Sequence, residues 1–239
     1  MKKLVIIPTY NERENVARMI EKVLSLEGDF HLLFVDDGSP DGTADIVESY
    51  QKEKGERVNL IKRGGKMGLG TAYIAGFKWA LERDYDYIFE MDCDFSHNPD
   101  DLLRLTARLD NDADVAIGSR YVRGVNVVNW PLSRLLMSYF ASKYVRVVTS
   151  MPVHDATAGF VGYRREVLKT MNLPSVEMVG YGFQIEMKYT AWKLGFRLAE
   201  ESIIFIDREA GVSKMSSGIF GEAFFGVLKL PFRKIYRSL

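Results

Sequence analysis

The stretch Leu4-Val5-Ile6-Ile7-Pro8-Thr9-Tyr10-Asn11-Glu12-Arg13-Glu14 sets the pattern for the first half of this 239-residue chain. Four apolar residues end at Pro8, and an amphipathic pattern follows from about Arg13 to Ser25. A run this short predicts a buried strand, because the apolar region of a signal peptide needs about 7 to 15 residues. We therefore expect a strand, a turn and a helix in this order.

The same unit recurs along the first half. Short apolar runs, each halted by polar residues or glycine, predict further strands at Leu32–Val35, Val58–Ile61, Tyr87–Met91 and Val115–Gly118. Helical patterns lie between them at about Ala44–Gln51, Thr71–Arg83 and Asp100–Leu109. Because strand–helix alternation is typical of parallel strands covered on both faces, we expect a Rossmann-like α/β sheet. Ligands of such sheets bind beyond the carboxyl ends of the strands.

The second half is less regular. We expect strands at Phe160–Tyr163 and Ile203–Ile206, and helices at Leu132–Val148, Gly182–Leu194 and Ser216–Leu230. The sequence has no internal repeat and no low-complexity linker. We therefore expect one domain over residues 1–215, with a mostly parallel central sheet and helices on both faces. An amphipathic segment follows over residues 216–239.

Composition excludes several classes of protein. Hydrophobic residues make up 47% and charged residues 27%, as in ordinary soluble globular chains. The 32 basic residues balance 32 acidic ones, so no global field favours nucleic acid as a partner. The single Cys93 cannot form an internal disulfide, and no run reaches the roughly 18 to 20 apolar residues of a membrane span. We expect a cytoplasmic protein.

The loops after the first two predicted strands carry polar residues that could either form turns and helix caps or bind a ligand. Asn11 can cap the following helix, with Glu14 completing a capping box, which leaves Tyr10 and Glu12 without a structural task. Asp36-Asp37-Gly38-Ser39-Pro40-Asp41-Gly42-Thr43 is rich in turn formers, and Thr43 is a plausible N-cap. Adjacent carboxylates repel unless a cation or donor groups offset them. A plain turn and a ligand site both stay open here.

Asp92-Cys93-Asp94, after the fourth predicted strand, is the sharpest feature. In extended chain, residues two apart point to the same side, so both carboxylates can converge on one point. Oxygen ligands of this kind suit Mg²⁺ or Mn²⁺, although a lone D-x-D pair is common by chance. We expect Cys93 to pack as a small apolar residue and His97 to lie at the surface or in a cap.

Basic residues follow at the same predicted edge. Arg120 comes after the fifth strand, with Arg123 and Arg134 close behind, and Arg208 and Lys214 flank a Gly-containing loop. Each alone suits a solvated surface. Together, beside paired acids, they predict an anion held against a metal by arginine contacts to phosphate.

In their order along the chain, these motifs resemble the GT-A family of inverting glycosyltransferases, and within it the polyprenol-phosphate (dolichol-phosphate) mannose synthases. The matching segments run from the N-terminus to about Met215: Pro8-Thr9-Tyr10-Asn11-Glu12, Asp36 to Thr43, Gly68-Leu69-Gly70, Asp92 to His97, Gly118-Ser119-Arg120-Tyr121, Asn129-Trp130-Pro131, Ala158-Gly159-Phe160, Gly182 to Met187, Asp207-Arg208 and Ser213-Lys214. Two positions depart from the pattern: Cys93 replaces the usual Ala, and Ala158 stands where Ser usually precedes the Gly.

The resemblance implies a nucleotide-sugar site that binds GDP-mannose. Pro8, Tyr10 and Glu12 would form the cradle for the guanine nucleoside, completed by Val35 and Asp37.

The resemblance also assigns the metal and the phosphates. Asp92 and Asp94 would hold Mg²⁺ or Mn²⁺ with help from Ser96, beside the Cys93 backbone. Two further pairs would bind phosphates: Arg120 and Arg134 the acceptor phosphate, and Arg208 and Lys214 the donor diphosphate.

The implied acceptor, a polyprenyl phosphate, explains why the site needs no general base. A phosphate monoester has a second pKa of about 6, so the nucleophile is already deprotonated at neutral pH. We expect Glu186 to orient the site. An isoprenoid acceptor places the enzyme peripherally at the cytoplasmic face of a membrane, and a separate membrane anchor protein is an expected partner. The apolar spacing of residues 216–239 and its basic end suit an interfacial segment, and packing against the sheet is the alternative.

Other functions stay open. A polyprenyl-phosphate glucosyltransferase that uses UDP-glucose would share the fold and geometry. A sugar-nucleotide sensor would bind the donor without turnover. A pyrophosphorylase should instead have a Gly-rich loop after the first strand, where this chain has Pro8-Thr9-Tyr10.

Overall fold

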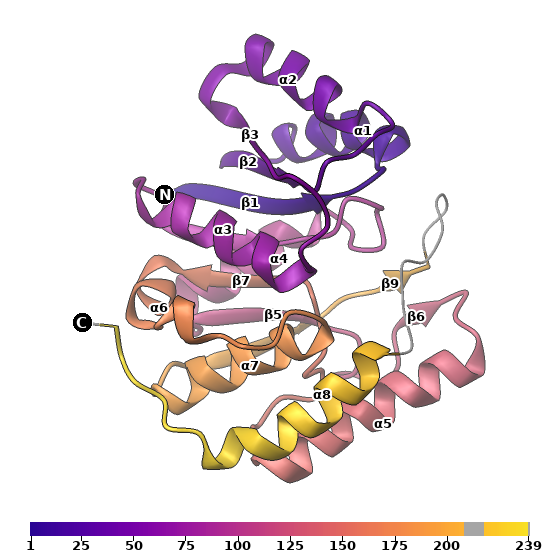
Figure 1. The fold of residues 1–239 in the computed structure, drawn as a ribbon, viewed down its shortest axis with the longest axis vertical. Helices are drawn as coiled ribbons and strands as arrows, with labels where there is room; N and C mark the ends of the chain where they lie inside the picture. The colour runs from indigo at the N-terminus through magenta and orange to yellow at the C-terminus, as the bar shows by residue number, and fades with distance from the viewer. Residues whose placement is uncertain (208–217, 239) are drawn as a thin grey trace.

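The computed structural model describes residues 1–207 and 218–238 (Figure 1). Its main sheet has seven strands in the order β3-β2-β1-β4-β7-β5-β8. Their bounds are β1 Lys2–Thr9, β2 Asp29–Asp36, β3 Val58–Lys62, β4 Tyr87–Glu90, β5 Val115–Ser119, β7 Val161–Arg164 and β8 Leu198–Ser202. Strand β7 runs antiparallel to both neighbours, and every other pairing is parallel. The expected mostly parallel α/β sheet is confirmed.

Eight helices and a second small sheet complete the described fold. The helices are α1 Arg13–Leu24, α2 Thr43–Lys54, α3 Leu69–Leu81, α4 Asp101–Asn111, α5 Leu132–Thr149, α6 Arg165–Thr170, α7 Tyr181–Lys193 and α8 Gly218–Lys229. Short 3-10 turns lie at Gly55–Arg57, Leu173–Ser175 and Leu230–Phe232. Strands β6, Val127–Val128, and β9, Phe205–Ile206, pair in parallel beside the main sheet.

Helices cover both faces of the main sheet because its central strands are apolar on both sides. In β1, Leu4 and Ile6 join one buried cluster, which includes residues of α3, α6 and α7. Val5 and Ile7 join the other cluster, with residues of α1 and α4. Successive side chains of a strand point to opposite faces, so the four apolar residues in a row are buried on both faces of β1.

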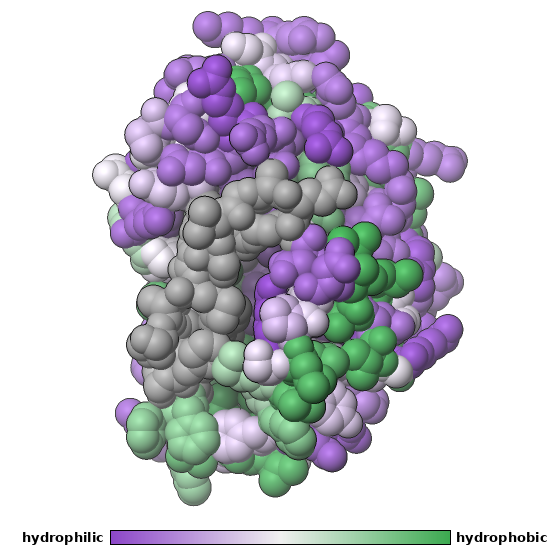
Figure 2. Space-filling model, turned by 90° about the vertical axis from the view of Figure 1, so that its right-hand side faces the viewer, coloured by the Kyte–Doolittle hydropathy of each residue, from purple (hydrophilic) through white to green (hydrophobic). Residues whose placement is uncertain are grey.

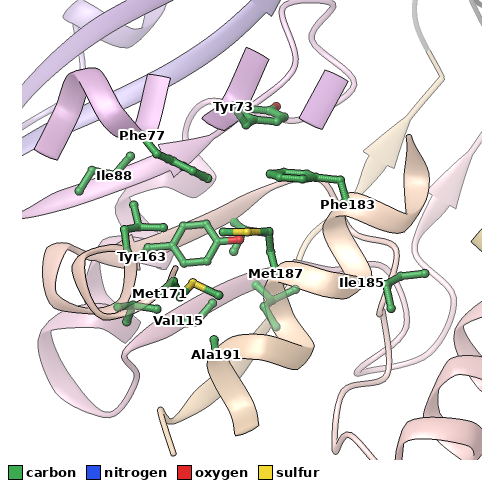
Figure 3. Packing of buried hydrophobic residues seen from close by; sticks show 14 of the residues in the cluster. Tyr73, Phe77, Ile88, Val115, Tyr163, Met171, Phe183, Ile185, Met187 and Ala191 are labelled. Atoms are coloured by element: carbon green, nitrogen blue, oxygen red, sulfur yellow. The ribbon is translucent and has the colours of Figure 1, made fainter. Parts of the chain in front are cut away.

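Aromatic rings tie α3 and α7 to the sheet in the first of these clusters (Figure 3). Tyr73 of α3 stacks on Phe183 of α7 with ring centres 5.9 Å apart. Phe77 meets Tyr163 of β7 edge-on at 5.7 Å. This packing holds α7 against one face of the sheet.

The strand expected at Ile203–Ile206 is wrong in part. Strand β8 is Leu198–Ser202, and β9 begins only at Phe205. The pattern was missed because β8 is an edge strand whose five residues are all half-buried and include two glutamates. Such a strand gives neither an apolar run nor a clear alternation.

Helix α8 packs on α7 and α5, and it also leaves apolar side chains exposed. Val227 and Leu230 are buried in the core, and Tyr144 of α5 stacks on Phe224 with ring centres 4.8 Å apart. At Gly226 a Cβ atom would lie 2.5 Å from the Met178 side chain, so glycine permits this close approach.

The expected boundary between residues 215 and 216 lies outside the described residues. Within them, every helix is too short or too polar to cross a membrane.

Candidate active site

Six parallel strands of the main sheet end at one edge, and the predicted site residues lie there. Tyr10, Glu12 and Asp37 follow β1 and β2. Asp92 follows β4, and Arg120 follows β5. The strand order places β1 directly between β2 and β4, and β5 lies beyond β4 with only the antiparallel β7 between them. The rule that ligands bind beyond the carboxyl ends of strands therefore selects one continuous region.

The adjacent acids after β2 have separate partners. Asp36 is buried and accepts hydrogen bonds from the Thr9 hydroxyl, from the Ser39 hydroxyl and N–H, and from the Gly38 N–H. Asp37 pairs with Arg63, whose Nε lies 2.5 Å from Asp37 Oδ1. Hydrogen-bond donors thus offset the charge of Asp36, and the Arg63 guanidinium offsets that of Asp37. The hydrogen bonds of Asp36 hold the turn together. The sequence did not single out Arg63 as the partner of Asp37.

Both predicted helix caps in this region are wrong. The backbone of Asn11 is left-handed, with φ of 56°, and α1 begins only after Glu12. Asn11 N–H donates to the Ser39 hydroxyl instead, at 2.9 Å. Thr43 is the first residue of α2 rather than its cap, and its hydroxyl accepts from the Glu12 N–H at 2.9 Å. Contacts between the two loops, which short-range patterns do not contain, decided both helix starts.

The remaining nucleoside-cradle candidates lie around these loops. The Lys66 ammonium stands 3.8 Å from the centre of the Tyr10 ring. Glu12 accepts a hydrogen bond from the Asn15 amide at 3.0 Å. Pro8 is half-buried at the end of β1, and the Val35 side chain is fully buried in the core. Any contact of Val35 with a ligand would therefore involve its backbone.

Asp92 and Asp94 line a cavity of about 740 Å³, together with Ser96. The chain leaves β4 at Glu90 and turns sharply, with Phe95 in left-handed backbone and Ser96 N–H donating to Asp94 Oδ1 at 3.1 Å. Both residues line one cavity, and a loop carries them in place of the extended strand that the sequence predicted, while their convergence on one metal ion stays a prediction. Cys93 is buried among apolar residues, as expected.

The oxygen atoms here fit a hard divalent cation. Two carboxylates face the cavity, and the buried Ser96 hydroxyl makes no hydrogen bond within the described residues. No group of three or more His, Cys, Asp or Glu side chains that could hold a metal occurs in residues 1–207 and 218–238. Mg²⁺ and Mn²⁺ need no such cage, because they bind through one or two carboxylates and take further oxygens from substrate phosphates.

The prediction that His97 lies at the surface or in a helix cap is wrong. It is buried, stacks on Phe160 with ring centres 5.0 Å apart, and meets Phe205 edge-on. Its Nδ1 accepts from the Asp92 N–H at 3.2 Å. Burial lowers the pKa of His97 to about 4, so the ring is neutral at pH 7. The ring supports the loop that carries Asp92.

Arg120 is held by a second loop that the sequence did not reveal. Its Nε and Nη2 donate to the Asp155 carboxylate at 2.7 and 2.6 Å, and Nη2 also donates to the Thr157 hydroxyl at 2.9 Å. Burial alone would raise the pKa of Asp155, but the charge and hydrogen bonds of Arg120 hold it below the ordinary value. The guanidinium is therefore fixed at the wall of the cavity.

Arg134, from the first turn of α5, faces the same cavity. Its Nη1 donates to Asp207 Oδ1 at 2.9 Å, and its guanidinium carbon lies 4.1 Å from the centre of a Trp130 ring. The Arg120 guanidinium lies 5.4 Å from the same ring. Trp130 thus holds the two predicted phosphate-binding arginines at one place. Arg123 is exposed and is not among the described residues that line the cavity.

Glu186, which we expected to orient the site, does not join this group. Glu186 accepts hydrogen bonds from the Glu177 and Met178 N–H groups and from Arg233, and it is not among the described residues lining the cavity. It ties the chain before α7 to the C-terminal end. Arg208 and Lys214 lie outside the described residues.

The cavity has a polar end and an apolar end. Asp92, Asp94, Arg120, Arg134 and Asp207 line the first. The apolar end lies between α5, α7 and α8 and is lined by Met137, Phe140, Ala141, Tyr144, Val145, Ile185, Phe224 and Val227. In Figure 2 hydrophobic residues gather on the lower part of the face shown, while the upper part is hydrophilic. One continuous space therefore joins charged groups to an apolar wall.

Comparison with known proteins agrees with this geometry. The family model described as Glycosyl transferase family 2 matches residues 4–171. Polyprenol monophosphomannose synthase of Mycolicibacterium smegmatis is 47% identical over 230 residues, which are 96% of this chain and 87% of the relative. Undecaprenyl-phosphate mannosyltransferase of Micrococcus luteus is 44% identical over 229 residues, which are 96% of this chain and 93% of that relative. The resemblance to polyprenol-phosphate mannose synthases is confirmed.

Solved structures agree in fold. Glucosyl-3-phosphoglycerate synthase from Mycobacterium tuberculosis, in complex with phosphoglyceric acid, gives a TM-score of 0.66 at 15% identity, covering 98% of this chain and 81% of the other. The same enzyme in complex with Mn²⁺, UDP and glucosyl-3-phosphoglycerate gives a TM-score of 0.64 at 16% identity, covering 96% of this chain and 78% of the other. The chain therefore belongs to glycosyl transferase family 2 and is a glycosyltransferase with a GT-A fold.

Proposed function

We propose that this enzyme transfers mannose from GDP-mannose to a polyprenyl phosphate, with inversion at the anomeric carbon. The observation that carries the proposal is the cavity, whose charged end suits a phosphate and whose apolar end suits a hydrocarbon chain. The names of the two relatives, at 47% and 44% identity, support mannose as the sugar and a polyprenyl phosphate as the acceptor.

The donor binds across the ends of β1, β2 and β4. The nucleoside lies between Tyr10, Glu12 and Asp37, beside Pro8 and the Val35 backbone. Asp92 and Asp94, with Ser96 and next to the backbone of Cys93, would hold Mg²⁺ or Mn²⁺. The metal supplies positive charge that stabilises the departing nucleoside diphosphate. Arg208 and Lys214 add charge to the same leaving group.

The acceptor phosphate binds to Arg120 and Arg134. Since a phosphate monoester is largely dianionic at neutral pH, it attacks without a general base. One phosphate oxygen forms a bond to the anomeric carbon as the bond from that carbon to the nucleoside diphosphate breaks. Attack opposite the leaving group inverts the configuration. The two arginines offset the repulsion between the two anions and fix the line of attack.

The membrane face of the enzyme consists of α5, α8 and the C-terminal end. Exposed apolar side chains of these segments include Phe140 and Phe224, which line the apolar end of the cavity, together with Leu136, Phe225 and Leu228. Lys229 ends α8, and Arg233, Lys234 and Arg237 follow it in a stretch without acids. Apolar and basic groups side by side suit the cytoplasmic leaflet of a bilayer, from which the lipid enters. A separate membrane anchor protein would bind this same face.

A donor scan tests the proposal. Purified enzyme with Mn²⁺ and a detergent-dispersed polyprenyl phosphate is incubated with GDP-mannose, GDP-glucose, UDP-glucose or UDP-mannose, and the lipid product is measured. We expect product chiefly from GDP-mannose, with β linkage by NMR. Product from UDP-glucose alone would overturn the donor assignment. Nucleotide binding without any lipid product would identify a sugar-nucleotide sensor instead.

A further inference from the structure

Helix α7 carries a lysine that is completely buried. The Lys188 ammonium donates to the carbonyl oxygens of Ala158 at 2.6 Å, of Gln184 at 3.0 Å and of Ala156 at 3.2 Å. Within the described residues none of these partners is a carboxylate. Burial lowers the pKa of Lys188 to about 8. Burying an ammonium costs several kcal/mol, so an apolar residue would serve better here if α7 only had to pack.

Two of the three carbonyls belong to a loop that has no regular structure of its own. Residues 151–160 connect α5 to β7 without helix or strand. Thr157, Ala158 and Gly159 of this loop line the cavity. Because such a loop lacks ladder or helical hydrogen bonds, other groups must satisfy its backbone. Lys188 satisfies the carbonyls on both sides of Thr157.

The same loop holds Arg120. Asp155 takes the Arg120 guanidinium through both oxygens, and Thr157 accepts a third hydrogen bond from it. Glu200 of β8 fixes the start of the loop by accepting from the His154 and Asp155 N–H groups at 2.8 and 2.9 Å. The loop is therefore held from the β8 side by Glu200 and from the α7 side by Lys188.

Helix α7 itself is anchored to β4 one turn before Lys188. The buried amide of Gln184 donates to Glu90 at 2.7 Å, and Gln184 also lines the cavity. Lys188 Nζ lies 3.4 Å from the Gln184 side-chain oxygen. A continuous polar path thus runs from β4 through α7 to the Arg120 loop.

We propose that Lys188 is a positioning residue, which holds residues 155–159 so that Asp155 and Thr157 aim the Arg120 guanidinium at the acceptor phosphate. The inference rests on the proposed acceptor role of Arg120. Lys188 is not among the described residues that line the cavity, and two of its three carbonyl partners belong to the loop that holds Arg120. The nucleoside loops lie after β1 and β2, on the other side of β4.

The test uses Lys188→Met, which keeps the length of the side chain and removes its donors. The matched control is Lys193→Met, an exposed lysine on the same helix. Initial rates with GDP-mannose and polyprenyl phosphate give kcat and both KM values, and titration with GDP gives the nucleotide Kd. For Lys188→Met we expect the acceptor KM to rise about tenfold, with the GDP Kd within twofold of wild type. Lys193→Met should match wild type.

A merely structural role predicts something else. It would lower the melting temperature and the active fraction while leaving the acceptor KM unchanged, and that result would overturn the proposal. Should Lys188→Met fail to fold, Thr157→Val removes the hydroxyl that Lys188 positions and leaves the lysine in place. We expect the same tenfold rise in acceptor KM, and an unchanged KM again overturns the proposal. Absence of turnover in the wild-type enzyme would instead contradict the proposed function.

Discussion

The two ends of the site are built differently. At the nucleoside end, Asp36 binds groups in its own turn and on the neighbouring strand, two, three and 27 residues away. At the acceptor end, Arg120 is held by a residue 35 positions away and Arg134 by one 73 positions away. The first end is polar and belongs to regular strand–helix units. The second end combines cations with an apolar wall from three helices. Donor and acceptor recognition should therefore respond separately to mutation.

Asp94→Ala should have the largest effect, because Asp94 lies where the two ends meet. We expect transfer to fall at least about 1,000-fold in saturating Mn²⁺, since the metal contributes several kcal/mol of charge stabilisation to the leaving group. Transfer is measured by release of GDP. Asp100→Ala, an exposed aspartate in a surface pair with Lys22, serves as the control. Turnover that survives Asp94→Ala would remove the metal from this place.

Arg134→Met tests the acceptor end. The acceptor KM should rise roughly 10- to 100-fold, because a charged contact to phosphate contributes about 1.5 to 3 kcal/mol. The KM for GDP-mannose should stay within twofold. Arg123→Met removes an exposed arginine of the same region and should change neither constant. Equal rises in both KM values would contradict the separation of the two ends.

Arg63→Met tests the nucleoside end, where we expect nucleotide binding to change and acceptor binding to stay the same. Loss of the partner of Asp37 should weaken GDP binding about tenfold, as expected for one charge-assisted hydrogen bond, and leave the acceptor KM unchanged. Isothermal titration with GDP measures the effect. Lys62→Met is the control, since Lys62 forms an exposed pair with Glu48 that contributes little. A shift in the acceptor KM alone would reverse the assignment of the two ends.

Phe225→Ser should have the smallest effect and should appear only at a bilayer. Phe225 is 64% exposed on α8, and partial burial of its ring in lipid is worth about 1 kcal/mol. We expect vesicle binding and transfer on anionic vesicles to fall about fivefold, with unchanged transfer to a short detergent-soluble acceptor. Leu103→Ser changes an exposed residue of α4 and should have no such effect. Deleting α8 would be a poorer test, because Val227 of this helix is buried.

The regular part of the fold could be predicted closely. Leu4–Ile7 lies within β1, and Leu32–Val35 lies within β2, because a central parallel strand must be apolar on both faces. The edge strand β8 could not be predicted, because its half-buried residues include glutamates and form no apolar run. Helix starts were also misplaced where a neighbouring loop supplied the hydrogen bonds, as at Asn11 and Thr43.

The site divides in the same way. The types of residue at the strand ends pointed to Asp92, Asp94 and Arg120, and the structure brings all three to one cavity. Their supports were not predictable, because Asp155 and Lys188 reach the site through contacts of more than 30 residues in sequence. His97 was misjudged for a related reason: only the packed structure shows the aromatic rings that bury it.

The order of apolar runs and strand-end acids by itself determined the mostly parallel sheet and the edge that carries the chemistry, and the family followed from the resemblance of the motifs. Local spacing suffices for this, because strand and helix periods and the polarity of a βα unit are short-range properties. The tertiary structure alone decided which charges pair, which polar side chains become buried, and how α5, α7 and α8 enclose an apolar space beside two arginines. Those outcomes depend on long-range packing, whose partners are not neighbours in sequence.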